Sequence, residues 1–415
     1  MNKIVSILDF KVQGFEFSKV SNVALVRHSL ANWKALVALM AVAVVSGCST
    51  TPEKDIYNEF YDGQASAVYL QTDPPETIEE ATYRGDMALK ERDSDRALFE
   101  YIRGLALDDN NEGLLYKVGS IHASRGNHEL AQTAYEQVID INAEHVGALE
   151  GMGLVLLEVR EYEQSEVYFK RSIRADQSRI EHKLMGTDLN ADPKLKKEKK
   201  YKRVRDEQDV AMSKNQNTVK TVAPEYRNKP IQYNGPQVKV DKNSPYRAYN
   251  SMGVISDLKK DYVEGLLYYK VALKIKPRSA VVWNNMGYSR YLAGDWKAAE
   301  KSFKRAIGYK ENYNQAWKNL GLLYTRQERY PEALSTFGRL MEKYQAYNDI
   351  GYLCMLEGKH EQAAEFFSKA LQLSPSYYEM AKENLERNRS LREIDSDYRT
   401  GHEERNIQGG HDTNS

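Results

Sequence analysis

Few side chains of this 415-residue chain could do covalent chemistry, and its two cysteines are the first to consider. Cys48 and Cys354 can form at most one disulfide, and no group of cysteines and histidines has the spacing of a zinc site. The sequence shows no nucleophile elbow, no HExxH motif and no phosphate loop, so we expect no enzyme, no metal and no cofactor. Cys48 differs from Cys354 in its surroundings, because it comes directly after eleven apolar residues, 35–45, and two small ones.

The apolar stretch before Cys48 is too short to cross a bilayer, which takes about 20 residues. It suits the hydrophobic region of a secretion signal, because Arg27 and Lys34 precede it. Its end, Val45-Ser46-Gly47-Cys48, resembles the bacterial lipobox. The alternatives are an uncleaved anchor and a signal that the ordinary signal peptidase removes.

The lipobox resemblance implies that residues 1–47 are a signal peptide and that the thiol of Cys48 forms a thioether to diacylglycerol. Residues 48–77 would then be a lipidated tether. Acyl chains add about 0.8 kcal/mol per buried methylene, so several of them hold a protein on a membrane. Ser49 after the cysteine implies sorting to the outer membrane of a Gram-negative cell, with the protein facing the periplasm.

The rest of the chain repeats itself with a period of 34 residues. A small residue follows each repeated glycine by twelve positions, and an aromatic residue follows it by sixteen. These spacings predict pairs of helices that approach closely at the glycine, with the aromatic rings between one unit and the next. The glycines are Gly85, Gly119, Gly153, Gly253, Gly287, Gly321 and Gly351.

The 34-residue period and its positions resemble the tetratricopeptide repeat, which implies an all-α solenoid. We predict two arrays, with three repeats in residues 78–179 and four in residues 246–377. The sixth repeat, 314–343, is four residues short, which indicates a trimmed second helix or turn. Residues 378–391 are expected to form a capping helix, and the polar residues 392–415 a disordered tail.

The insert between the two arrays, 180–245, lacks the repeat pattern. Its segment Lys194–Arg205 carries eight basic residues against one glutamate. Such a segment is either a docking patch for an acidic partner or anionic lipid, or a solvated helix and linker. Nucleic acid is a poor partner for a periplasmic protein, and the whole chain has 59 basic and 59 acidic side chains.

In tetratricopeptide solenoids the first helix of each repeat lines an inner wall. We expect the second array to bind a protein segment there, because asparagine amides can hydrogen-bond a peptide backbone and tyrosine rings add contact area. These asparagines are expected to point away from the helix pair. The predicted wall residues are Arg247, Asn250, Asn284, Tyr288, Tyr291, Lys318, Leu322, Asn348 and Tyr352. Cys354, by contrast, should be a buried small hydrophobe.

Three stretches, 283–296, 317–330 and 347–388, resemble the TadD-like tetratricopeptide lipoproteins of tight-adherence (Flp) pilus assembly. The resemblance implies a periplasmic scaffold that binds the outer-membrane secretin or other components of the pilus secretion machine. Two alternatives remain open from the sequence. One is a pilotin-like secretin assembly factor of type IV pili, and the other is an adaptor for periplasmic cell-wall hydrolases or proteases.

Overall fold

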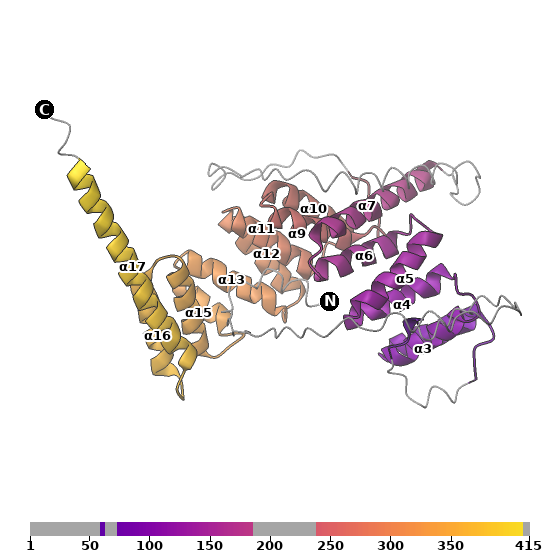
Figure 1. Ribbon diagram of the computed structural model, residues 1–415, viewed down its shortest axis with the longest axis horizontal. Helices are drawn as coiled ribbons and strands as arrows, with labels where there is room; N and C mark the ends of the chain where they lie inside the picture. The colour runs from indigo at the N-terminus through magenta and orange to yellow at the C-terminus, as the bar shows by residue number, and fades with distance from the viewer. Residues whose placement is uncertain (1–58, 63–72, 186–237, 410–415) are drawn as a thin grey trace, which may run out of the picture. The chain divides into compact units, whose positions relative to one another are not determined.

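The computed structural model describes residues 59–62, 73–185 and 238–409, and every regular element in these ranges is a helix (Figure 1). The all-α prediction is therefore confirmed. Cys48, the predicted signal peptide, most of the tether and residues 186–237 of the insert lie outside the described residues. In the described part of the chain, no helix is both long and apolar enough to cross a bilayer.

The described helices come in pairs that begin where the sequence places the repeats. The described residues form two compact units, which divide at Gln137. The first two pairs are α2 (Ile78–Lys90) with α3 (Ser94–Leu105) and α4 (Glu112–Arg125) with α5 (His128–Ile141). The later pairs are α6 (Val146–Glu158) with α7 (Tyr162–Met185), α9 (Tyr246–Leu258) with α10 (Tyr262–Ile275), α11 (Ala280–Leu292) with α12 (Trp296–Tyr309), α13 (Asn314–Arg326) with α14 (Tyr330–Phe337), and α15 (Lys343–Leu356) with α16 (His360–Leu373).

The helices within a pair approach each other at the repeated glycine. A Cβ built on Gly287 would lie 2.7 Å from the ring of Phe303, and one on Gly253 would lie 2.6 Å from the ring of Tyr269. The predicted role of the glycine is thus confirmed. The position of the ring differs from our expectation, because each aromatic residue lies against the glycine of its own repeat.

The sixth repeat is short because α14 has 8 residues, whereas α10, α12 and α16 have 14 each. The predicted trimming is confirmed. The C-terminal end differs from our prediction, since α17 (Glu379–Gly409) continues past residue 391 into the stretch expected to be disordered. A helix that is already nucleated on a packed repeat can extend through charged residues without an apolar stripe of its own.

The third repeat packs directly against the fourth, although the insert separates them in the sequence. Both α6 and α7 contact α9 within the compact unit that begins at residue 138. Glu150 of α6 is buried and accepts hydrogen bonds from the Arg247 guanidinium at 2.7 and 2.9 Å and from the backbone N–H of Ala248 at 3.1 Å. Arg179 of α7 pairs with Asp241, which precedes α9, at 2.8 and 3.0 Å. We predicted two arrays divided by the insert. The packing instead continues from the third repeat to the fourth.

Candidate partner-binding site

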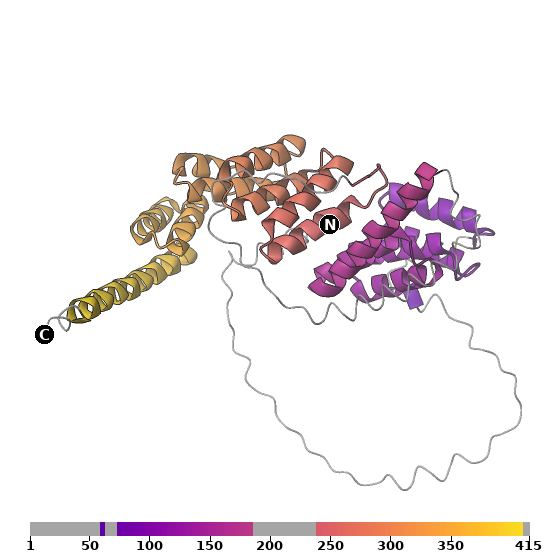
Figure 2. The ribbon, with the colours of Figure 1, turned by 90° about the horizontal axis from the view of Figure 1, so that it is seen from above.

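The first helices of the repeats from residue 138 onward line one side of the stack. Each first helix contacts the next, from α6 through α9, α11, α13 and α15 to α17. Among the described helices, successive second helices α10, α12, α14 and α16 make no comparable contact with one another. From α9 onward, each first helix therefore contacts both helices of the preceding repeat, and the continuous row of first helices forms the inner side of the stack. Figure 2 shows the repeats from residue 138 onward following one another in the order that the colours give.

The predicted wall asparagines form hydrogen bonds from one repeat to the next. Asn285 donates to Asn250 at 3.1 Å, and Asn319 donates to Asn284 at 2.9 Å. Asn384 of α17 donates in the same way to Asn348 at 3.0 Å. We call this row the asparagine ladder.

The asparagine ladder corrects the sequence argument about these residues. Asn284 is 1% exposed and Asn348 is 2% exposed, so their amides do not point away from the helix pair into solvent. They are buried between neighbouring first helices, where each amide accepts a hydrogen bond from another asparagine. A buried amide needs such a partner, because an unsatisfied polar group costs about 1–3 kcal/mol. The repeated asparagine therefore fixes how one repeat sits on the next.

The predicted wall tyrosines lie together beside a cation. The rings of Tyr288 and Tyr291 stack with centroids 5.8 Å apart. Arg326, one repeat later, donates to the Tyr291 hydroxyl at 3.1 Å and lies 5.3 Å from the centre of its ring. Burial raises the pKa of Tyr291. Tyr291 is buried by this contact and Tyr288 is half-buried, so Tyr288 is the ring that a ligand can touch.

The other predicted wall residues have different surroundings. Lys318 is exposed. Burial raises the pKa of Asp349 in the next repeat, and the positive charge of Lys318 opposes this rise. Leu322 and Tyr352 are half-buried and pack against the core of the last repeats. Arg247 is held by Glu150 at the junction with the third repeat.

A row of leucines completes the wall, and the sequence argument missed it. Leu258, Leu292 and Leu356 each follow a ladder asparagine by eight residues, and they are 38%, 36% and 57% exposed. Residues eight apart on a helix share a face, so this spacing is a signal that could have identified them. Arg326 occupies the same place in the sixth repeat, and its side chain is 46% exposed. We call Leu258, Leu292, Leu356 and Arg326 the exposed wall row.

The structure supports the structural reading of Cys354. Its side chain is 1% exposed, and its sulfur lies 3.8 Å from the hydroxyl oxygen of Tyr330. Burial raises the pKa of the thiol, which keeps it protonated at neutral pH. The predicted buried hydrophobe is confirmed. Among the described residues, no three His, Cys, Asp or Glu side chains are grouped so that they could hold a metal ion.

Three stretches of the chain match the tetratricopeptide repeat family: residues 113–145, 284–343 and 344–377. The human cell division cycle protein 16 homolog is 29% identical over 119 residues, which are 26% of this chain. The chain spans only 19% of the length of that relative.

Two solved structures are similar over about three quarters of this chain. A tetratricopeptide repeat protein from Parabacteroides merdae is 13% identical, with a TM-score of 0.42, and covers 76% of this chain and 99% of its own. The type IV pilus biogenesis factor PilW is 14% identical, with a TM-score of 0.40, and covers 75% and 99%. The helix pairs, the repeated glycines and the three matched stretches agree that this chain is built from tetratricopeptide repeats.

Proposed function

We propose that this chain is a scaffold whose inner wall binds a segment of a protein partner during assembly of a tight-adherence pilus machine. The exposed wall row supports the binding part of the proposal, because it exposes leucines at one repeated position of the first helices. The pilus part rests on the sequence resemblance of residues 283–296, 317–330 and 347–388. Tetratricopeptide solenoids supply the extended surface that such a role needs.

The chemistry of the wall indicates what kind of segment fits. The ladder amides are already hydrogen-bonded, so recognition falls to the exposed leucines, to Tyr288 and Tyr352, and to the cations between them. Covering the leucines removes apolar surface from water at about 25 cal/mol per Å². Lys318 interrupts the leucines with positive charge, and Arg326 adds a second cation that pairs with Glu357 at 3.6 Å. A segment with apolar side chains and a carboxylate between them would match this order.

Replacing Leu292 and Leu356 together by aspartate should abolish partner capture without unfolding the repeats. Both side chains are partly exposed, and losing the burial of a leucine costs up to about 1.5–3 kcal/mol. Two such losses predict an affinity decrease of more than tenfold, since about 1.4 kcal/mol is tenfold. Crosslinking in intact envelopes followed by affinity capture measures the loss, and circular dichroism checks the fold.

Leu373→Asp is the matched control for the wall variants, because Leu373 is 46% exposed on the second helix α16. If the double wall variant and this control captured the partner equally, the wall assignment would be wrong. Capture of cell-wall hydrolases in place of pilus components would refute the pilus role and leave the wall assignment intact.

We also propose that the scaffold is anchored to the outer membrane by a lipid on Cys48. This proposal rests on the lipobox resemblance, and Cys48 lies outside the described residues. Replacing Cys48 by alanine should abolish palmitate labelling and move the protein out of the outer-membrane fraction. Palmitate labelling that persists in the variant would rule out this anchor.

A further inference from the structure

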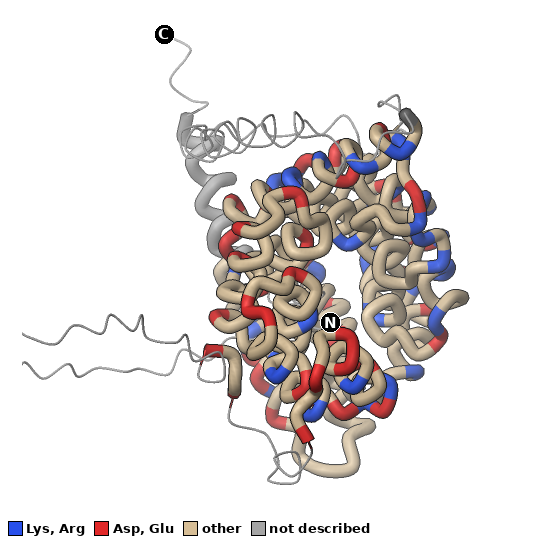
Figure 3. Tube along the Cα trace, turned by 90° about the vertical axis from the view of Figure 1, so that its right-hand side faces the viewer, with Lys and Arg blue, Asp and Glu red and all other residues tan. Residues whose placement is uncertain are grey.

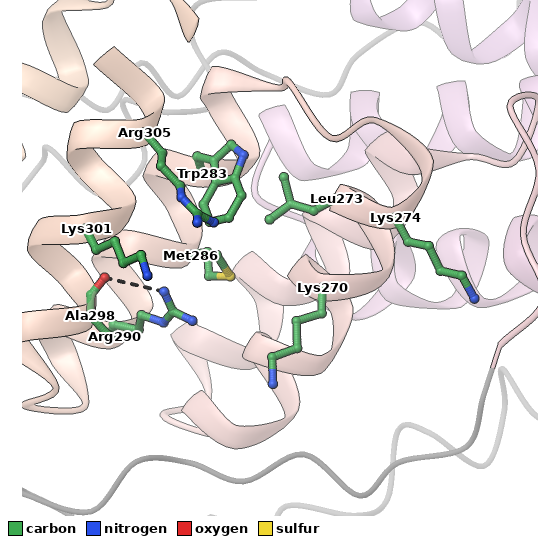
Figure 4. A pocket seen from close by; sticks show the side chains of 9 residues that line it. All are labelled: Lys270, Leu273, Lys274, Trp283, Met286, Arg290, Ala298, Lys301 and Arg305. Atoms are coloured by element: carbon green, nitrogen blue, oxygen red, sulfur yellow. Dashed lines mark hydrogen bonds between the residues drawn. The ribbon is translucent and has the colours of Figure 1, made fainter. Parts of the chain in front are cut away.

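A cavity rich in cations lies at the fourth and fifth repeats, and none of the proposed wall residues lines it. It has a volume of about 530 Å³ and is lined from α10, α11 and α12 (Figure 4). Five of its nine lining residues are lysine or arginine, and none is aspartate or glutamate. Elsewhere along the described helices, charges of both signs are interspersed (Figure 3). The cavity therefore departs from the balanced charge of the whole chain.

The cations reach the cavity from three helices. Lys270 and Lys274 are four residues apart on α10, and Lys301 and Arg305 are four apart on α12. Residues at this spacing lie on one helix face, where like charges repel. Arg290 enters from α11, between the two pairs.

The close view separates the cations by direction. Arg290, Lys301 and Lys270 lie around the side chain of Met286 (Figure 4). Arg305 lies over the ring of Trp283 at 4.5 Å from its centre. Lys274 points away and donates to the backbone carbonyl of Val238 at 3.1 Å.

Arg290 donates its hydrogen bonds to neutral acceptors, and the charged groups that act on it are Arg305, Lys270 and one carboxylate, Asp295. Its guanidinium donates to the Ser302 hydroxyl at 2.6 Å and to the Ala298 carbonyl at 3.4 Å. Burial and Arg305 both lower the pKa of Arg290, and Asp295 opposes them. The Asp295 carboxylate accepts the Ala298 N–H at the start of α12, so it is already engaged as a helix cap. Burial and Arg290 in turn lower the pKa of Lys270.

The next repeat shows that packing alone does not require this charge. A second cavity of about 300 Å³ occupies the equivalent place 34 residues later, with Trp317 in the position of Trp283. Tyr324 replaces Arg290 there, Ser335 replaces Lys301, and Glu332 adds a carboxylate. The arginine over the tryptophan is kept, since Arg339 lies 5.5 Å from the ring of Trp317. Lys304 lines the second cavity in the position of Lys270, so Arg290 and Lys301 are the proposed ligand residues whose charge is particular to the first cavity.

We propose that the cavity of Arg290, Lys301 and Lys270 binds a phosphate-bearing anion. A phosphate group carries up to two negative charges and several acceptor oxygens, which suit a guanidinium fork and two ammonium groups better than a single carboxylate does. Met286 and Leu273 give the floor an apolar part, on which the rest of the ligand can lie. The volume is within the usual range of small-ligand sites. A free phosphorylated molecule and a phospholipid headgroup both supply this chemistry.

The test is binding of inorganic pyrophosphate to the full chain by calorimetry, in buffer of constant ionic strength. Lys301→Glu is the test variant, because Lys301 is exposed and reversing its charge removes no core contact. Lys343→Glu is the matched control, since Lys343 is exposed on α15 and does not line the cavity. We expect Lys301→Glu to weaken pyrophosphate binding at least tenfold and Lys343→Glu to change it less than twofold.

Cosedimentation with vesicles of phosphatidylcholine plus phosphatidic acid distinguishes the two sources of phosphate. Vesicle binding that is lost in Lys301→Glu and kept in Lys343→Glu identifies a headgroup as the ligand. Pyrophosphate binding without vesicle binding identifies a free phosphorylated molecule. Equal binding by the two variants, or no binding of either probe to the unaltered chain, would overturn the proposal.

Discussion

Gly287→Leu is expected to destabilise the repeats from residue 138 onward by about 3 kcal/mol or more, the upper end of the usual cost of overpacking. A Cβ at this position would lie 2.7 Å from two ring carbons of Phe303 and 3.1 Å from the Cβ of Ser302. Phe303 is fully buried and belongs to a core cluster, so moving its ring would displace other core residues. Neighbouring repeats stabilise each other in a solenoid, and the loss should therefore spread beyond the fifth repeat.

A thermal melt followed by circular dichroism measures the effect of Gly287→Leu, and about 3 kcal/mol corresponds to a decrease of roughly 6–12 °C. Gly308→Ala is the control, because no atom lies within 4 Å of a Cβ built there. Alanine is favoured over glycine in a helix by up to about 1 kcal/mol, so the control should melt at the same temperature or higher. Unchanged melting of Gly287→Leu would mean that the helix pair does not close at this glycine.

The second large effect is expected from Asp257→Asn, which should stabilise the protein at pH 8. Asp257 is 4% exposed and accepts hydrogen bonds from Ser289 at 2.7 Å and Tyr269 at 2.8 Å. Burial raises the pKa of Asp257 to about 7, and the two hydrogen bonds only partly oppose the rise. An asparagine keeps the shape and both contacts without the charge, since its oxygen can accept from one hydroxyl and its nitrogen can donate to the other.

The direction of the pH dependence follows from the raised pKa. The folded chain holds a proton on Asp257 up to about pH 7, whereas the unfolded chain releases it near the ordinary value of 3.8. Between these values the folded state binds more protons, so its stability decreases as the pH rises from about 4 to 7. Each pKa unit is worth about 1.4 kcal/mol, which gives a few kcal/mol in total.

Urea denaturation at pH 5 and pH 8 tests this expectation. The advantage of Asp257→Asn over the unaltered chain should be larger at pH 8 than at pH 5. Asp261→Asn is the control, because Asp261 is exposed and caps α10 by accepting the Glu264 N–H, a role that asparagine fills equally well. A difference between Asp257→Asn and the unaltered chain that stayed constant across this range would show that Asp257 is ionised in the folded state.

The helix pairs could be predicted from the sequence because each pair depends on contacts within about 34 residues. The glycine and the aromatic residue sixteen positions later both belong to one repeat, so their spacing predicted the helix pair, although the ring was expected between repeats and lies against the glycine of its own repeat. The asparagine ladder could not be read in this way. Asn284 could face solvent or Asn319, and the outcome depends on how tightly two repeats stack. The spacing of residues within one repeat carries no information about this stacking.

The basic cavity escaped the sequence argument for a related reason. A contiguous run such as Lys194–Arg205 is conspicuous in a sequence, and it fell outside the described residues. The cavity instead collects its cations from three helices, and each helix contributes only one or two. The tail was misjudged because polar composition was taken to indicate disorder, whereas α17 continues a helix that begins on the last repeat.

Because α7 packs against α9, the third and fourth repeats are neighbours even though the insert separates them in the sequence. Glu150 and Arg179 fasten the fourth repeat to the third through side chains, so the two ends of the insert are held together whatever joins them. Lengthening a loop whose ends are already fixed costs little, about 0.6 kcal/mol for each doubling. Insertions or deletions within 186–237 should therefore cost the packing of the stack little. Such a change would leave the side-chain contacts between the third and fourth repeats in place.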